Sequence, residues 1–217
     1  ILAFLFSVLG TFLVRSGILT SVHTFALDPT RGIYILFFIA ILGIYSLALF
    51  SSRSKIYFTN NYFSFFSKEG SILVNNIILV VVCATVLLGT IYPLLIEALT
   101  NNKISIGEPY YNSTVVPIML PALFIMGVGP ILSWGNDSGL RIAKRISPTF
   151  LITLLMTIII FLIYKSYTFL GIAGIIIAFW IIFNNLTILY RNKFSNLTGM
   201  VVAHLGVGFL ILGITAS

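Results

Sequence analysis

Charged residues are scarce in this sequence, since Asp, Glu, Lys and Arg make up only 8% of its 217 residues. A soluble domain carries about a quarter charged residues. Hydrophobic residues make up 59% of the chain, in long apolar runs that leave no room for a polar outer face. Most of the surface must therefore face lipid. This composition excludes a soluble domain and predicts an all-α integral membrane protein, a polytopic helical bundle.

Cysteine is almost absent, and several motifs that carry chemistry are missing. Cys83 is the single cysteine, which excludes an internal disulfide or a CxxC pair, and its place in an apolar run predicts a small, buried space-filler. The sequence has no glycine-rich phosphate loop, no Ser/His/Asp set and no HExxH motif. Its apolar runs lack the Asp, Glu and Lys relay that an ion or proton transporter subunit would need. We therefore predict no catalytic side chain and disfavour a transporter.

Apolar runs of about the 20 residues needed to cross a bilayer recur along the chain and predict its transmembrane helices. The predicted spans are residues 1–14, 33–50, 71–95, 115–133, 148–164, 169–190 and 199–215. The first run is short and position 1 is Ile rather than Met, so we expect an internal stretch of a longer protein. Without a linker long enough to separate domains, residues 1–217 are expected to form one transmembrane region.

Basic residues are distributed unequally between alternate loops, which predicts the orientation in the membrane. Loops retained in the cytoplasm or matrix carry an excess of Lys and Arg. One set of loops carries eight basic residues and the other carries four. The eight are Arg53, Lys55, Lys68, Arg141, Lys144, Arg145, Arg191 and Lys193, and the four are Arg15, Arg31, Lys103 and Lys165. Residues 15–32 and 96–114 are therefore expected to face the periplasm or the intermembrane space. The net charge of +7 then reflects retained loops rather than nucleic-acid binding.

His204 lies inside the last predicted span, about 7–8 Å from its inner end at a rise of 1.5 Å per residue. An ionisable residue inside a span indicates a functional site. Ala203, Gly206 and Gly208 surround it with small side chains, which would leave space for something flat and bulky such as a heme. The alternative is a histidine that is hydrogen-bonded to a neighbouring helix, with the glycines serving only helix packing.

His23 lies in the predicted outer loop, in a segment with the pattern of a short helix on the membrane surface. Apolar residues fall on one arc of residues 18–26 and polar residues fall opposite, with His23 at the rim. Asp28-Pro29 then predicts an N-cap and a first helical residue for the next span. Arg15 and Arg31 bracket the segment and would suit an anionic ligand such as heme carboxylates, or serve as interface anchors.

Two pairs of asparagines, Asn75-Asn76 and Asn184-Asn185, lie near the inner ends of their predicted spans. Hydrogen bonds between helices explain them more simply than a transport path does.

Residues 9–26, LGTFLVRSGILTSVHTFA, followed by DPTRG at residues 28–32, closely resemble the cytochrome c-type biogenesis proteins of the CcmF/NrfE family. Three further stretches agree with the same family in the same order. They are Glu69-Gly70 with Asn75-Asn76, residues 88–94, LGTIYPL, and residues 202–207, VAHLGV. The resemblance covers nearly the whole chain.

The resemblance implies a membrane component of the cytochrome c heme lyase, which attaches heme through thioether bonds to a CxxCH apocytochrome c. It implies that His23 is an axial ligand of the heme being delivered, which is the substrate, and that His204 ligates a resident heme b. It implies as partners a heme chaperone of the CcmE type, apocytochrome c with thiol-handling subunits of the CcmH type, the lipid bilayer, and quinol as a candidate electron source. The location would be the bacterial or mitochondrial inner membrane.

The family's tryptophan-rich heme-handling motif is missing here, because Trp134 and Trp180 are isolated. The family's two other ligating histidines are missing as well, and the resemblance places all of these features upstream of residue 1. This stretch alone is therefore expected to be inactive. A heme carrier or exporter of the same superfamily, without attachment activity, is the alternative function.

Overall fold

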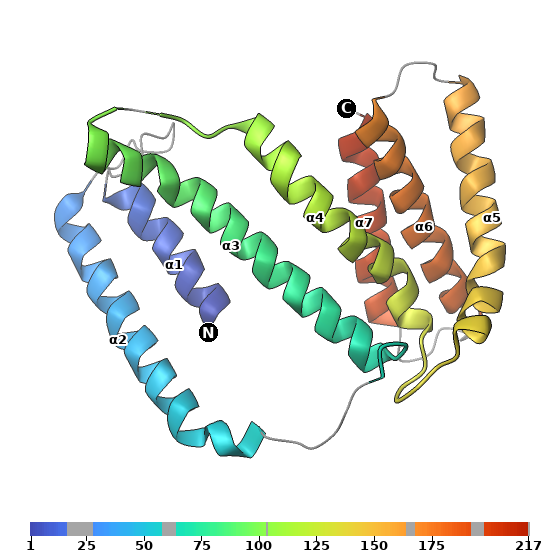
Figure 1. Cartoon of the computed structure of the whole chain (residues 1–217), viewed down its shortest axis with the longest axis horizontal. Coiled ribbons are helices and arrows are strands. Elements are labelled where there is room, and N and C mark those ends of the chain that lie inside the picture. The colour runs from blue at the N-terminus through green and yellow to red at the C-terminus, as the bar shows by residue number, and fades with distance from the viewer. Residues whose placement is uncertain (17–27, 58–63, 103, 164–167, 192–197, 217) are drawn as a thin grey trace. The chain divides into compact units, whose positions relative to one another are not determined.

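The structure is a computed structural model of the whole chain and describes residues 1–16, 28–57, 64–102, 104–163, 168–191 and 198–216. Over these residues it is all-α, and Figure 1 shows its helices in chain order. The α-helices are α1 (Leu2–Arg15), α2 (Pro29–Arg53), α3 (Lys68–Thr100), α4 (Glu108–Val128), α5 (Gly139–Ile163), α6 (Phe169–Arg191) and α7 (Thr198–Ala216). Two short 3₁₀ helices, η1 (Ser54–Tyr57) and η2 (Gly129–Ile131), follow α2 and α4.

The helices match the predicted spans closely. Six of them are long and apolar enough to cross a membrane, and α1 is a shorter apolar helix of 14 residues. The prediction of a polytopic helical bundle with a short first helix is therefore confirmed. The largest differences are at two helix starts, because α4 begins at Glu108 instead of residue 115 and α5 begins at Gly139 instead of residue 148. Each continues for one or more polar turns beyond its apolar segment, which a search for apolar runs does not detect.

The described residues form two compact units. The first comprises Ile1–Asn61 and Ile91–Ile104, and the second comprises Tyr62–Thr90 and Ser105–Ser217. The helix α3 runs through both, with residues 68–90 in the second unit and 91–100 in the first.

In the first unit, α1 packs against α2, and Asp28 joins the end of one to the start of the other. The Asp28 N–H donates to the Arg15 carbonyl at 3.1 Å. Its carboxylate accepts from the Thr30 hydroxyl at 2.6 Å and from the Arg31 N–H at 3.1 Å. These bonds, that from Thr30 foremost, lower the pKa of Asp28. The predicted N-cap at Asp28, with proline beginning the helix, is confirmed.

In the second unit, α6 is the most buried helix and packs against α4, α5 and α7 (Figure 1). Its core residues are Ile177, Trp180 and Ile181. The Trp180 ring stacks on Phe124 with centroids 5.1 Å apart, and its indole N–H donates to the Phe124 carbonyl at 3.0 Å. Gly127 in α4 makes room for this indole, because any Cβ there would collide with it.

Polar side chains also join the helices of this unit. Asn184 of α6 is fully buried and accepts a hydrogen bond from the Thr149 hydroxyl of α5 at 2.8 Å. This confirms the predicted interhelical hydrogen bond for Asn184. Asn185 instead donates to the Ile181 carbonyl of its own helix. Asn75 and Asn76 make no side-chain hydrogen bond to any described residue.

Cys83 is exposed on α3, so the expectation that it is a buried space-filler is wrong. The apolar run around it is correct as a transmembrane segment. A lipid-facing surface is as apolar as a packed one, so hydropathy does not distinguish a residue facing lipid from one facing another helix.

A polar loop at residues 132–138, between η2 and α5, is fixed by the buried carboxylate of Asp137. The side chain is fully buried and accepts from the Ser133 N–H at 3.1 Å and the Ser138 N–H at 2.9 Å. Arg145 of α5 donates to the same carboxylate at 3.0 Å. Burial by itself raises the pKa of Asp137, yet these hydrogen bonds and the Arg145 charge outweigh it and lower the pKa below its ordinary value.

The 132–138 loop in turn fixes the start of α3. Gly135 has a φ of 77°, a conformation that glycine adopts without strain, and its N–H donates to both carboxylate oxygens of Glu69 at 3.0 Å. The Lys68 N–H donates to the Ser133 carbonyl at 3.0 Å. The Ser67 hydroxyl accepts from the Gly70 N–H at 2.9 Å, as an N-cap residue does.

Gly208 of α7 should be more sensitive to substitution than Gly206, two residues earlier. A Cβ at Gly208 would lie 2.6 Å from Cγ1 of Ile182 in α6, whereas nothing lies within 4 Å of a Cβ at Gly206. Gly208→Ala should destabilise the protein by about 1–3 kcal/mol through overpacking. Gly206→Ala should be neutral or slightly stabilising, because alanine favours the helix. Thermal unfolding of both variants in detergent checks this, and equal melting temperatures would contradict the packing described for α6 and α7.

Replacing Asp137 should cost stability in a pH-dependent way. A carboxylate whose pKa is lowered by folding stabilises the protein above its unfolded pKa of about 3.9 and loses this effect as the pH falls through its folded pKa. Asp137→Asn should therefore melt below the wild type at pH 7, and the difference should shrink below about pH 4. Glu108→Gln, at an exposed carboxylate, is the control. A gap that persists unchanged in acid would contradict the role assigned to the Asp137 charge.

Candidate functional site

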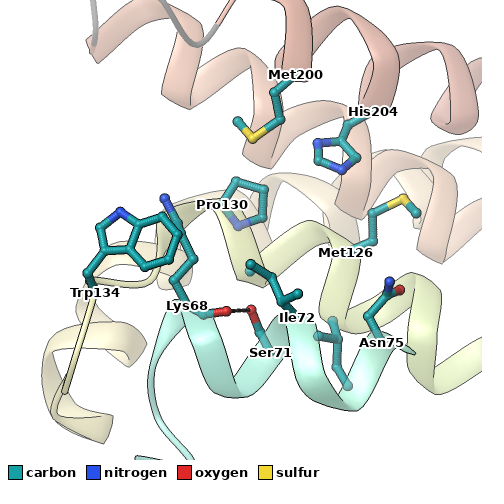
Figure 2. A pocket seen from close by; sticks show the side chains of 11 residues that line it. Lys68, Ser71, Ile72, Asn75, Met126, Pro130, Trp134, Met200 and His204 are labelled. Carbon is teal, nitrogen blue, oxygen red and sulfur yellow. Dashed lines mark hydrogen bonds between the residues drawn. The ribbon is translucent and has the colours of Figure 1, made fainter. Parts of the chain in front are cut away.

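A cavity of about 370 Å³ lies in the second unit, between α3, α4, η2 and α7. Its size is within the range of about 300–1,000 Å³ that is typical of small-molecule and cofactor sites. Figure 2 shows the side chains that surround it. The cavity is lined by Lys68, Ser71, Ile72, Asn75, Ile125, Met126, Gly129, Pro130, Trp134, Met200 and His204.

One wall of the cavity is a single face of α3. Lys68, Ser71, Ile72 and Asn75 are spaced i, i+3, i+4 and i+7, so they share one side of the helix. Lys68 lies in the first turn, where the 132–138 loop holds the backbone, and Asn75 lies two turns further along. The 132–138 loop fixes the residue at which α3 begins. It therefore also fixes the position of each of these side chains along the cavity wall.

His204 lines the cavity from α7 (Figure 2). The residue is half-buried, and its Nδ1 atom is fully buried with no hydrogen-bond partner. The alternative of an imidazole hydrogen-bonded to a neighbouring helix therefore has no support from the described residues. A buried polar atom without a partner is costly, so an unpartnered imidazole at the edge of a cavity is suited to a ligand.

The glycines near His204 do not contribute in the way the sequence suggested. Gly208 faces α6, where its missing side chain admits Ile182, so it serves helix packing. Gly206 has open space around it, and neither glycine lines the cavity. The space beside His204 comes instead from the separation of α3 from α7, with Met126 and Met200 at its border (Figure 2).

The other sequence-predicted site residues are not brought to this cavity. Arg15 ends α1 and Arg31 begins α2, both in the first unit. The Arg31 guanidinium is 3.1 Å from the Asp28 carboxylate, so it already has an ionic partner. His23, and the interfacial helix predicted around it, lie outside the described residues.

Lys68, Asn75 and Trp134 line the cavity but were not predicted to be site residues. Lys68 was counted only as a basic residue on the inner side, and Trp134 stood alone without a motif. These residues lie together because the 132–138 loop, which begins 64 residues after Lys68, contacts the start of α3. A local sequence pattern does not contain such a long-range contact.

The cavity combines an imidazole, a cation and an amide with apolar walls. Among the described residues, no group of His, Cys, Asp and Glu side chains could hold a metal ion by itself. His204 could, however, supply one ligand to a metal that is already held in a macrocycle. The thioethers, the indole and the isoleucines at the walls suit a flat apolar ligand, and Lys68 suits an anionic group on it.

The chain is similar to several curated proteins of cytochrome c maturation. It is 37% identical over 231 residues to the cytochrome c-type biogenesis protein CycK of Rhizobium meliloti, covering 99% of this chain and 34% of that protein. It is 37% identical over 222 residues to CcmF of Escherichia coli, with the same two coverages. It is 35% identical over 223 residues to NrfE of Haemophilus influenzae, covering 100% of this chain and 35% of that protein.

No protein-family model matches the chain, and no solved structure matches it. The chain spans about a third of the length of the curated relatives that it matches. The CycK, CcmF and NrfE relatives nevertheless match this chain over nearly its whole length. Its helices are those of a multi-pass membrane protein. The resemblance found in the sequence is confirmed: the chain belongs to the CcmF/CycK/NrfE family of cytochrome c-type biogenesis proteins.

Proposed function

We propose that this chain is part of a membrane heme lyase that matures cytochrome c. Heme would be held at the outer face of the membrane for attachment to a CxxCH apocytochrome c, and a second, resident heme b would lie within the bundle. Membership of the cytochrome c biogenesis family supports the pathway. The cavity at His204 supports the resident heme.

The single observation that carries the resident site is the His204 imidazole, which lines an apolar cavity while its Nδ1 atom has no partner. In this proposal His204 would hold heme b through its imidazole, and a second ligand would come from the remainder of the full-length protein. Heme bound there supplies one-electron redox chemistry, which would keep the delivered heme iron ferrous. Quinol is the proposed electron donor.

The outer site in this proposal is built on His23, with Arg15 and Arg31 as partners for heme carboxylates. His23 and His204 must serve different irons. By the predicted orientation, His204 would lie about 7–8 Å from the inner end of its span and His23 on the opposite side of a hydrocarbon core about 30 Å thick. An imidazole nitrogen ligates a metal from about 2 Å, so one iron cannot reach both.

The attachment step itself needs positioning rather than acid–base groups of this chain. Each cysteine thiol of the apocytochrome adds across a heme vinyl group, so that sulfur bonds to one vinyl carbon and hydrogen ends on the other. The role of the chain would be to hold the substrate heme by its iron and carboxylates while the thiols approach. The proposed partners are a heme chaperone that delivers the heme and subunits that keep the apocytochrome thiols reduced.

A heme carrier without attachment activity is the second candidate. It would bind heme at the outer site but would not need a redox-active heme inside the membrane. In this proposal the cavity at His204 favours the lyase, because a pocket between α3, α4 and α7 suits a resident cofactor rather than cargo in transit.

His204→Ala in the full-length protein should remove the resident heme. The loss of an axial ligand should weaken heme binding by more than about tenfold, since even changes to groups behind a metal ligand cost about 10–100-fold. Heme content and the optical spectrum of the purified protein measure this. Val202→Ala, an exposed position on the same helix, is the matched control. An unchanged spectrum in His204→Ala would refute the ligand assignment.

His23→Ala in the full-length protein should separate the two hemes. The heme b spectrum should stay intact, while cytochrome c maturation should fall because the delivered heme loses an axial ligand. Added imidazole should restore part of the activity by occupying the vacated position. Normal cytochrome c levels in this variant would reduce His23 to a surface residue.

The sidedness of His23 is checked by a cysteine at Thr24 in a protein without Cys83. A membrane-impermeant thiol reagent should label it in intact cells or spheroplasts. Labelling only after the inner membrane is broken would overturn the orientation, and with it the outer site.

A further inference from the structure

Lys68 carries the only formal positive charge among the described residues that line the cavity. Figure 2 shows its side chain reaching from the start of α3 toward α7, where Met200 and His204 lie. The residue is half-buried, and its ammonium lies over the ring of Trp134. A cation in such a position needs an anion or several hydrogen-bond acceptors.

The neighbouring carboxylates are already bound to other groups. Glu69 accepts from the Gly135 N–H with both of its oxygens, and Asp137 is held by Arg145 and two backbone N–H groups. Throughout the part of the chain that the structure describes, no carboxylate is within ion-pair distance of the Lys68 ammonium. Among the described residues, none accepts a hydrogen bond from its three N–H donors.

The 132–138 loop contacts Lys68 through both its backbone and its side chain. The Lys68 backbone is tied to the Ser133 carbonyl at 3.0 Å, and its Nζ lies 5.2 Å from the ring centroid of Trp134, in cation–π geometry. Trp134 is itself 66% exposed, so the indole orients the lysine without enclosing it. The 132–138 loop thus supplies both contacts that direct Lys68 toward the cavity.

We propose that Lys68 binds the carboxylate edge of the ligand that His204 holds by its iron, and that Trp134 positions Lys68 for this contact. The inference rests on the proposed function and specifies its inner site further. A heme has its iron at the centre of an apolar macrocycle and its two carboxylates on one edge. The cavity has the same asymmetry, with an imidazole on α7 and a cation at the polar end of α3.

The arrangement favours carboxylates over other groups at that edge. An ammonium–carboxylate hydrogen bond is about twice as strong as a neutral one. The carboxylates would lie at the level of the 132–138 loop, next to water, whereas the macrocycle would lie against Ile72 and Met126. The ligand would therefore enter with its polar edge toward the inner face of the membrane.

A competing role for Lys68 is that of an interface anchor that contacts lipid phosphates, as lysines near the ends of spans often do. The two roles differ in whether heme binding depends on the free carboxylates of the heme. An anchor is indifferent to whether the heme carries free carboxylates, whereas a carboxylate-binding residue is not.

The test uses the full-length protein with Lys68→Met, stripped of heme and titrated with ferric protoporphyrin IX and with its dimethyl ester. Binding is followed by the optical spectrum. Lys68→Met should weaken binding of the diacid by about tenfold, the loss of roughly one charge-assisted hydrogen bond, and should leave binding of the diester unchanged. Lys68→Arg should retain the preference for the diacid.

Lys144→Met, at an exposed lysine of α5 that does not line the cavity, is the matched control and should bind both hemes as the wild type does. Equal weakening of diacid and diester in Lys68→Met would make Lys68 a structural residue, and unchanged binding of both would make it an anchor. If Lys68→Met fails to fold, the affinities of the wild type for the two hemes test the proposal. Tighter binding of the diacid would support it, and equal affinity for diacid and diester would overturn it.

The outcome for Lys68 is separable from that of the proposed function. If His204→Ala loses its heme while Lys68→Met does not discriminate between diacid and diester, the resident heme stands and the carboxylate contact falls. If His204→Ala keeps its heme, both fall.

Discussion

The buried carboxylate of Asp137 determines where the cavity lies. Two backbone N–H groups and the Arg145 guanidinium compensate its charge, so the 132–138 loop has one conformation in place of many. That conformation presents the Ser133 carbonyl and the Gly135 N–H to the first residues of α3. The start of α3, and therefore the level of Lys68 and Asn75 beside the cavity, depends on an ion pair that itself does not touch the cavity.

The remainder of the bundle depends on packing, because lipid gives helices no hydrophobic reason to associate. The contacts of α6 follow this rule. Gly127 admits the Trp180 indole, Gly208 admits Ile182, and Gly174 receives Thr215 of α7. The buried hydrogen bond between Thr149 and Asn184 adds a directional contact on the α5 side. On the α3 side Gly129 of η2 lies against Ser71, whereas none of these glycine contacts joins α3 to α7, and the cavity lies between these two helices.

The sequence predicted the helices well but the candidate site only in part. The reason is that a helix depends on local sequence, whereas the site depends on contacts between distant residues. A span is a local property, so its apolar run and its caps, such as Asp28-Pro29, can be read directly. Burial is not local in a membrane protein, and the exposed position of Cys83 could not be inferred from hydropathy. His204 was found because a titratable residue inside a span is rare. Lys68 was missed because a lysine at the inner end of a span is ordinary, and only the fold of a distant loop distinguishes it.

The charges around the cavity also explain why ligand binding is a better interpretation than ion transport. A cation path needs carboxylates that are free to exchange their partners. Here Glu69 is held by the Gly135 N–H and Asp137 by Arg145, so neither negative charge is available to the cavity. Among the described residues that line it, Lys68 carries the one formal charge, and no described carboxylate is within ion-pair distance of its ammonium. In the proposed site this charge would oppose a passing cation and would favour an amphiphile that places an anionic edge at Lys68 and offers a metal to His204.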